Sequence, residues 1–240
     1  MIKDSRARQE GGLPTPEAPA VSRMAMQIRE WEGAADERSV FLTCYLLMTR
    51  NILSAIERRE FHDSAWVNSL MERFADYYFV ALEAYEKEPE SAPAVWQVAH
   101  NMTRAPNTLA LQKLLVGVNA HINFDLVLSL VDMLGPEWDA LAAEQRSARY
   151  DDHCHVNAVI GRTIDAVQDQ VLEPAMPWMA IIDELLGPVD EKLVSHLITH
   201  WREAVWHNAV QLLETREPSE RALLILRVEQ EALKLANRMV

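Results

Sequence analysis

The sequence predicts an all-α fold, a single compact multi-helix bundle of about eight to ten helices. Glycine is scarce, with 7 among 240 residues, and the chain is rich in residues with high helix propensity, such as Ala, Leu, Glu and Arg. No segment shows sustained alternation of β-branched and aromatic residues between Asn-Gly or Asp-Gly turns, so we predict no strand. Proline and glycine divide the chain with short joints, which favours antiparallel packing of neighbouring helices.

At the N-terminus, residues 1–15 are polar and rich in Pro, Gly, Glu and Arg, and we predict a disordered arm. Residues 16–240 are predicted to form one all-α domain, because no linker or internal repeat divides them. The string Thr15-Pro16-Glu17 is typical of a helix N-terminus with proline in the first turn, and this first helix should end near Glu32.

The next helices follow from aspartates that can act as N-caps. Asp36 is predicted to cap a helix over residues 37–59, and Asp63 a helix that ends near Glu88, followed by a break at Pro89 to Pro93. Further helices are predicted over residues 95–102, 107–134 and 137–147, from Asp151 or Asp152 to a point before Pro174, and over 176–186, 190–215 and 219–239.

Composition and charge narrow the classes of partner. Hydrophobic residues make up 49% and the net charge is −13. A surface this acidic repels nucleic acid and anionic membranes, so we expect a small-molecule substrate or ligand. The charged residues within Leu109–Leu134 argue against a membrane span. The two cysteines, Cys44 and Cys154, are expected to be free thiols, which fits a cytoplasmic location.

The most informative pair of residues is His121 and Asp125, in the apolar stretch from Leu109 to Leu134. A helix there would be buried around most of its circumference. The four-residue spacing puts both side chains on one face, and ionisable groups are rarely buried without a partner. One divalent metal ion, zinc first, could be bound by the pair, or Asp125 could orient His121 as a general base. A buried ion pair that only fixes helix packing is the alternative.

Other residues could complete a site. Asp152 and His153 begin a predicted helix and could face its core, where they would be further metal ligands if the two helices meet. Tyr45 and Thr49 supply hydroxyls within an apolar face. Arg202, between two tryptophans, is the cation expected to pair with a buried carboxylate or an anionic substrate group. A stripe of histidines over residues 196–207 lies opposite the apolar face of its helix and is interpreted as solvated.

These residues carry a resemblance. The strings Phe41-x3-Tyr45-x3-Thr49 and Gly117-x-Asn119-Ala120-His121-Ile122-Asn123-x-Asp125-Leu126 resemble an uncharacterised, mainly bacterial all-helical family, a domain of unknown function. Trp96, Asp152, Asn157, Trp201-Arg202 and Trp206 continue the likeness. The resemblance covers most of the chain after the arm and implies an all-α fold without a settled activity.

A second, weaker resemblance concerns chemistry. Gly117-x3-His121-x3-Asp125 is similar to an element of the zinc-dependent phospholipase C and P1 nuclease group, in which the His and Asp bind zinc. The Pro-x-His that follows the Asp in that group is missing here, so a three-zinc site is not expected.

The sequence therefore supports a small-molecule enzyme with a buried His-Asp site, with His121, Asp125, Tyr45 and Arg202 as catalytic or pocket residues. Metal-assisted hydrolysis is the first form of that hypothesis. The alternatives are a biosynthetic cyclase that uses His/Asp acid–base chemistry in an apolar cavity, and a non-enzymatic helical bundle that binds a ligand or a protein. The oligomeric state is left open.

Overall fold

The computed structural model describes residues 18–106, 108–169 and 191–239, and the predicted all-α class is confirmed: these residues contain helices and no strand. The elements are α1 (Pro19–Gly33), α2 (Ser39–Glu57), α3 (Ser64–Lys87), η1 (Pro89–Ser91), α4 (Ala94–Thr103), α5 (Ala110–Ala120), η2 (His121–Asp125), α6 (Leu126–Leu134), α7 (Ala143–Asp169), α9 (Glu191–Glu214) and α10 (Pro218–Met239). The predicted arm, the cap at Thr15 and the helix over 176–186 lie outside the described residues.

Several predicted helix ends are confirmed, because their signals are local. Asp63 is the N-cap of α3, and its carboxylate accepts the backbone N–H of Trp66 at 3.0 Å. The prediction that Asp36 caps α2 is wrong, because the N-cap position is Arg38 and no side chain caps the helix; α2 is also two residues shorter at each end than predicted. Asp36 lies before the first turn, where its carboxylate accepts the Arg38 backbone N–H at 3.0 Å and pairs with the Arg38 guanidinium at 2.6 Å.

The prediction of two helices over residues 137–147 and from 151 or 152 onwards is wrong. Residues 143–169 form one helix, α7. The first part of this segment is rich in Ala, Glu, Gln and Arg and contains neither Gly nor Pro, so nothing interrupts the backbone hydrogen bonds. Asp152 is therefore in the third turn of α7 and not at an N-cap.

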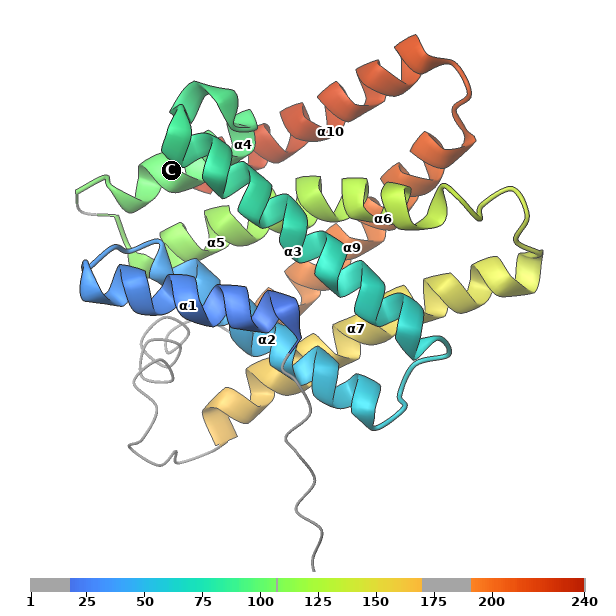
Figure 1. Cartoon of the computed structure of the whole chain (residues 1–240), viewed down its shortest axis with the longest axis horizontal. Coiled ribbons are helices and arrows are strands. Elements are labelled where there is room, and N and C mark those ends of the chain that lie inside the picture. Colours follow the sequence, from blue (N-terminus) through green and yellow to red (C-terminus); the bar gives the residue numbers. More distant parts are fainter. Residues whose placement is uncertain (1–17, 107, 170–190, 240) are drawn as a thin grey trace, which may run out of the picture.

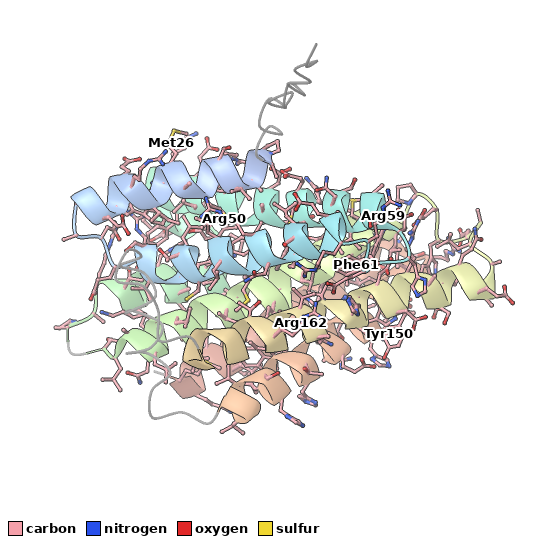
Figure 2. All side chains as sticks on the ribbon, turned by 90° about the horizontal axis from the view of Figure 1, so that it is seen from below. Met26, Arg50, Arg59, Phe61, Tyr150 and Arg162 are labelled. Atoms are coloured by element: carbon pink, nitrogen blue, oxygen red, sulfur yellow. The ribbon has the colours of Figure 1, made fainter. Side chains whose placement is uncertain are left out.

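Helices α5 and α6, joined by η2, cross the middle of the molecule, and α3 passes obliquely over them (Figure 1). The η2 segment contacts α3, α9 and α10, so neighbours cover it on several sides. The expected burial of this segment is confirmed, because most side chains from Lys113 to Leu134 are buried or half-buried. A second view shows α1 on one outer side, with Met26 pointing away from it, and α7 and α9 on the opposite side (Figure 2).

Two stretches of the described chain, Ser39–Glu57 and Ala110–Leu134, are long and apolar enough to cross a bilayer by length and composition alone. The charged residues of the second stretch therefore do not rule out a membrane span by length and composition alone. In the second stretch, Ala110–Leu134, 78% of the most apolar 18-residue segment is buried inside the fold, as in the core helix of a globular domain.

Polar side chains connect the central helix, which consists of α5, η2 and α6, to its neighbours. Asn119 donates from Nδ2 to the carbonyl of Ala232 in α10 at 2.9 Å, and Asn123 donates to Asn119 Oδ1 at 2.9 Å. Because the pair is buried or half-buried, it fixes α5 against α10 by hydrogen bonding and not only by apolar contact.

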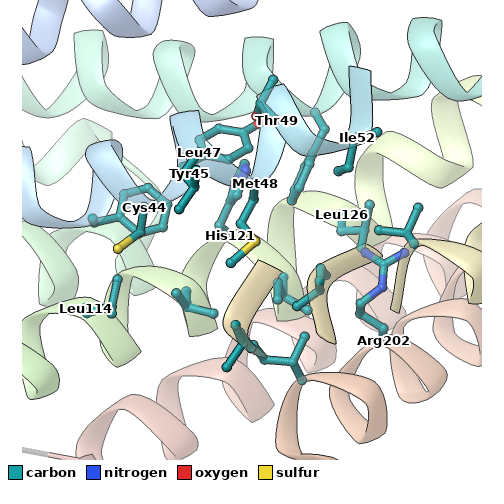
Figure 3. A pocket seen from close by; sticks show the side chains of 18 of the residues that line it. Cys44, Tyr45, Leu47, Met48, Thr49, Ile52, Leu114, His121, Leu126 and Arg202 are labelled. Carbon is teal, nitrogen blue, oxygen red and sulfur yellow. The ribbon is translucent and has the colours of Figure 1, made fainter. Parts of the chain in front are cut away.

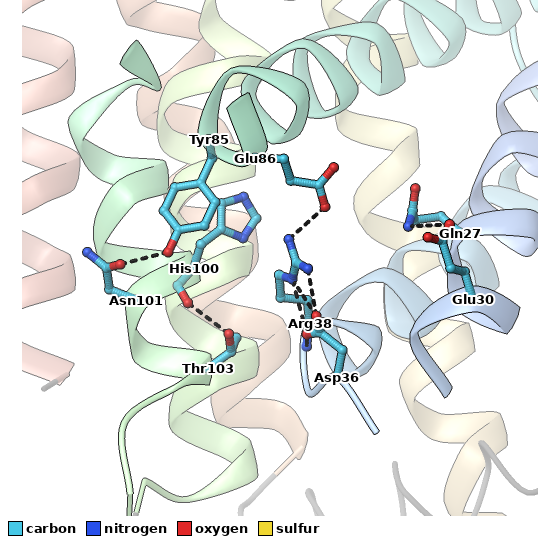
Figure 4. Close-up of polar contacts among 9 residues, drawn as sticks. All are labelled: Gln27, Glu30, Asp36, Arg38, Tyr85, Glu86, His100, Asn101 and Thr103. Carbon is cyan, nitrogen blue, oxygen red and sulfur yellow. Dashed lines mark hydrogen bonds and ion pairs between the residues drawn. The ribbon is translucent and has the colours of Figure 1, made fainter. Parts of the chain in front are cut away.

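A second polar cluster lies where α2 begins and α3 ends (Figure 4). Arg38 connects Asp36 to Glu86, at 2.6 and 2.9 Å. Behind it, His100 is buried against the rings of Tyr85 and Trp96. Burial lowers the pKa of His100 to about 3, so this imidazole is neutral in the folded protein at ordinary pH.

Candidate functional site

The site is built on a change of helix type. Between α5 and α6 the residues His121–Asp125 form a π-helical segment, in which the backbone N–H of Leu126 bonds to the carbonyl of His121, five residues earlier. Segments of this kind are rare and occur often at functional sites, since the wider turn changes the direction of the side chains it carries. Both ionisable residues of the predicted pair, His121 and Asp125, lie in this one turn.

The two side chains bond to each other. His121 Nδ1 lies 3.0 Å from Asp125 Oδ2, and both residues are buried, with 3% and 1% exposure. The indole N–H of Trp96, from α4, donates to both carboxylate oxygens at 3.1 and 3.0 Å. Within the described residues, no lysine or arginine pairs with Asp125. The Asp125 carboxyl group therefore contacts the indole N–H of Trp96 and one ring nitrogen of the His121 imidazole.

Aromatic rings enclose the imidazole. The His121 ring stacks flat on Phe74, with centroids 3.5 Å apart and planes 7° apart. The Tyr45 ring meets its edge at 4.3 Å, and the rings of Phe41 and Tyr78 lie further out. Such packing fixes the orientation of the imidazole, because a rotated ring would collide with its neighbours.

Burial shifts the pKa values of this group in the direction that removes charge. Desolvation holds the pKa of His121 well below its usual value, so the ring is neutral. Desolvation raises the pKa of Asp125 well above its usual value, although the Trp96 hydrogen bond lowers it. Desolvation also raises the pKa of the Tyr45 hydroxyl well above its usual value, so that it keeps its proton. The site thus contains a neutral imidazole beside a protonated phenol.

Three buried polar atoms at this place have no hydrogen-bond partner among the described residues: His121 Nε2, Tyr45 Oη and Thr49 Oγ1. Leaving a buried donor or acceptor unsatisfied costs about 1–3 kcal/mol, so such atoms call for an explanation. All three belong to residues that line one cavity. A ligand in that cavity would explain why they are left unsatisfied.

The cavity has a volume of about 170 Å³ and lies between α2, α3, the central helix, α7 and α9. Among the residues that the structure describes, its lining is almost entirely aliphatic and aromatic and includes no aspartate or glutamate. Cys44 and Leu114 mark one end and Arg202 the other, with Met48 and His121 between them (Figure 3). Apolar cavities of about 150 Å³ in other proteins stay dry and bind molecules of the size of benzene. This cavity has room for a small apolar molecule.

Asp152 and His153, proposed from the sequence as further metal ligands, are engaged elsewhere. The Asp152 carboxylate accepts the backbone N–H groups of His62 and Asp63 at 2.7 and 2.9 Å. His153 Nε2 lies 2.9 Å from the Arg202 carbonyl oxygen. Asp152 thus fixes the α2–α3 turn to α7, and His153 connects α7 to α9.

The donor set does not fit the expected zinc site. His121 Nδ1 and Asp125 Oδ2 bond to each other instead of meeting at a common ion, and Trp96 occupies both carboxylate oxygens. In the part of the chain that the structure describes, no three His, Cys, Asp or Glu side chains are grouped as metal ligands would be. We therefore derive no step through a metal ion.

Of the other sequence-predicted residues, Tyr45, Thr49 and Arg202 all line the cavity with His121. The histidine stripe of α9 is exposed at 196, 200 and 207, as expected. Sequence reasoning gave no role to Trp96 or Phe74, which hold Asp125 and His121. A usable signal was present for Trp96, since a buried indole N–H needs an acceptor and a buried carboxylate needs donors.

Comparison with known proteins identifies a family but no function. No curated protein and no solved structure gives a significant match to this chain. A family model described as a family of unknown function (DUF5995) matches residues 18–240. The resemblance to an uncharacterised helical family is thereby confirmed, and the chain belongs to the DUF5995 family of unknown function.

Proposed function

We propose that the protein is an enzyme that binds a small, mainly apolar organic molecule in the cavity and transfers a proton to or from it through His121. One observation carries the proposal: a neutral, buried histidine on the wall of an apolar cavity has Nδ1 bonded to a carboxylate and Nε2 without a partner. This is the arrangement of a general base whose tautomer is set by an orienting acid.

In this mechanism each residue has a separate task. The mechanism uses the ionised form of Asp125, which the Trp96 N–H stabilises. In that form Asp125 accepts Nδ1–H, which leaves the lone pair on Nε2 of His121 available to take a proton from the ligand. The imidazolium that forms is stabilised by the same carboxylate, and Trp96 keeps that carboxylate in place. The Tyr45 hydroxyl, protonated and without a partner, can donate a hydrogen bond to an oxygen on which negative charge develops.

Among the reactions considered from the sequence, this geometry favours acid–base chemistry without metal assistance. A cyclisation in which the aromatic walls hold the substrate folded is one form of it, and addition of water to an apolar substrate is another. The apolar lining restricts substrates to molecules with few polar groups, since each buried polar group without a partner weakens binding.

The test compares turnover by the wild type with turnover by Asp125→Asn, which keeps the shape of the side chain. Each protein is incubated with a small-molecule extract of cells that produce the protein, and consumption and formation of compounds are followed by mass spectrometry. We expect a compound that is consumed, and a product that appears, only with the wild type. If no compound is converted by the wild type, or if Asp125→Asn converts it equally well, the proposal is refuted.

A further inference from the structure

Arg202 is a buried cation whose partners among the described side chains and backbone are all neutral. The residue is 5% exposed. Its Nε donates to Asn157 Oδ1 at 2.7 Å, and its Nη2 donates to the carbonyl oxygen of His153 at 2.8 Å. None of the ion pairs in the described part of the chain includes Arg202, and no hydrogen bond there uses its Nη1 group. The sequence-based expectation of a buried carboxylate partner is therefore not met by any residue whose side chain the structure describes.

Burying an arginine without a counter-charge lowers the stability of the fold. Burial lowers its pKa only to about 10, so the guanidinium remains charged at neutral pH. A buried charge without a counter-charge destabilises a fold, whereas an apolar side chain of similar size would not. The partners that it does have, an amide oxygen and a backbone carbonyl, fix the guanidinium plane and leave Nη1 available.

The position of Arg202 connects this charge with the cavity. It lines the same cavity as His121, at the end away from Cys44 (Figure 3). Cys44 and Ile52 both line this cavity and are eight residues apart on α2, which corresponds to about 12 Å along the helix. A molecule in the cavity can therefore place one end at Arg202 and its apolar body near His121.

The charge in the cavity favours a singly charged anion. Among the lining residues in the described ranges, Arg202 is the one Lys or Arg, and none has an acidic side chain. A carboxylate brings one negative charge and planar oxygens that match the N–H groups of a guanidinium. A doubly charged phosphate would keep one charge uncompensated in an apolar space.

We propose that Arg202 binds the carboxylate of a small monocarboxylic acid whose apolar body fills the cavity and reaches towards His121. The inference rests on the proposed function of the cavity and names its substrate class. Arg202 is thus a binding residue that orients the ligand along the cavity, and the proton transfer takes place at the part of the molecule that lies beside His121 and Tyr45.

Calorimetric titration with two probes of the same chain length, octanoate and octanol, tests this proposal. We expect the wild type to bind octanoate more tightly than octanol. In Arg202→Gln the affinity for octanoate should fall about tenfold to a hundredfold, the usual effect of losing a hydrogen bond to a charged group, and the affinity for octanol should stay within about threefold. Arg162→Gln, which removes an exposed arginine of α7, is the matched control and should bind both probes like the wild type.

The outcomes separate the two proposals. Equal binding of octanol and octanoate by the folded wild type would overturn the role of Arg202, and this comparison holds even if Arg202→Gln does not fold. Unchanged octanoate affinity in a folded Arg202→Gln would overturn it as well. If octanoate binds as expected but the extract experiment shows no turnover, the carboxylate site stands and the acid–base mechanism is refuted.

Discussion

Replacing Asp125 in two ways should separate its role in stability from its role in proton transfer. In Asp125→Ala, the indole N–H of Trp96 and the imidazole of His121 both lose their acceptor in a fully buried place. Each stranded donor costs about 1–3 kcal/mol, so the two together cost about 2–6 kcal/mol. We expect a loss of unfolding free energy in that last range.

Asp125→Asn should behave differently. The amide oxygen can still accept the Trp96 N–H, and the amide nitrogen can donate to His121 Nδ1, so the loss of stability should stay below about 1.5 kcal/mol. The same change forces the proton of His121 onto Nε2, which abolishes its function as a base at that atom.

Urea unfolding followed by circular dichroism measures both effects, with Asp132→Ala as the matched control. Asp132 lies seven residues after Asp125, in α6, and pairs with Arg73 at the surface, where an ion pair contributes about 0–1 kcal/mol. If Asp125→Ala costs no more than Asp132→Ala, the buried network does not stabilise the fold and the argument from its geometry is refuted.

Three further changes have defined outcomes. Asp152→Ala should cost about 2–4 kcal/mol in urea unfolding, because two backbone N–H groups lose a charged acceptor; a loss below about 1 kcal/mol would contradict its structural role. Gly117→Ala places a Cβ 2.8 Å from a ring carbon of Phe41 in α2. The cost of overpacking, about 1–3 kcal/mol, should outweigh the gain in helix propensity of about 1 kcal/mol. A raised melting temperature would contradict this. The pKa values of His100 and His153 are lowered in the folded state, so the unfolded chain takes up their protons first as the pH falls below about 6.5. The free energy of unfolding should then drop by up to about 1.4 kcal/mol per pH unit for each histidine. His100→Gln should therefore show a shallower pH dependence of stability between about pH 6.5 and 5.

Local signals made most of the helices predictable. The cap at Asp63 and the proline at the start of α10 mark helix ends through interactions within one turn of the chain. The apolar character of residues 109–134 predicted a buried helix for the same reason, since burial follows from composition around the whole circumference. The site pair was predictable because it consists of two ionisable side chains in such a segment.

Tertiary contacts explain what could not be predicted. The partners of Asp152 lie about 90 positions earlier in the chain, at His62 and Asp63. No local sequence pattern shows that the backbone N–H groups of these two residues need an acceptor from another helix. The π turn at His121–Asp125 depends on how neighbouring helices pack around it, and five-residue hydrogen bonding has no simple sequence signal. The cavity that joins Tyr45, His121 and Arg202 brings together helices α2, η2 and α9, and only the fold shows that these meet.

The protonation state of His121 is the central claim, and nitrogen NMR of the histidine rings measures it directly. In the wild type, long-range proton–nitrogen correlations should show a neutral ring with the proton on Nδ1 and a bare Nε2, unchanged between pH 5.5 and 8, since burial holds the pKa of His121 well below its usual value. A charged imidazolium in this range, or a neutral ring with the proton on Nε2, would contradict the assignment of His121 as a base oriented by Asp125.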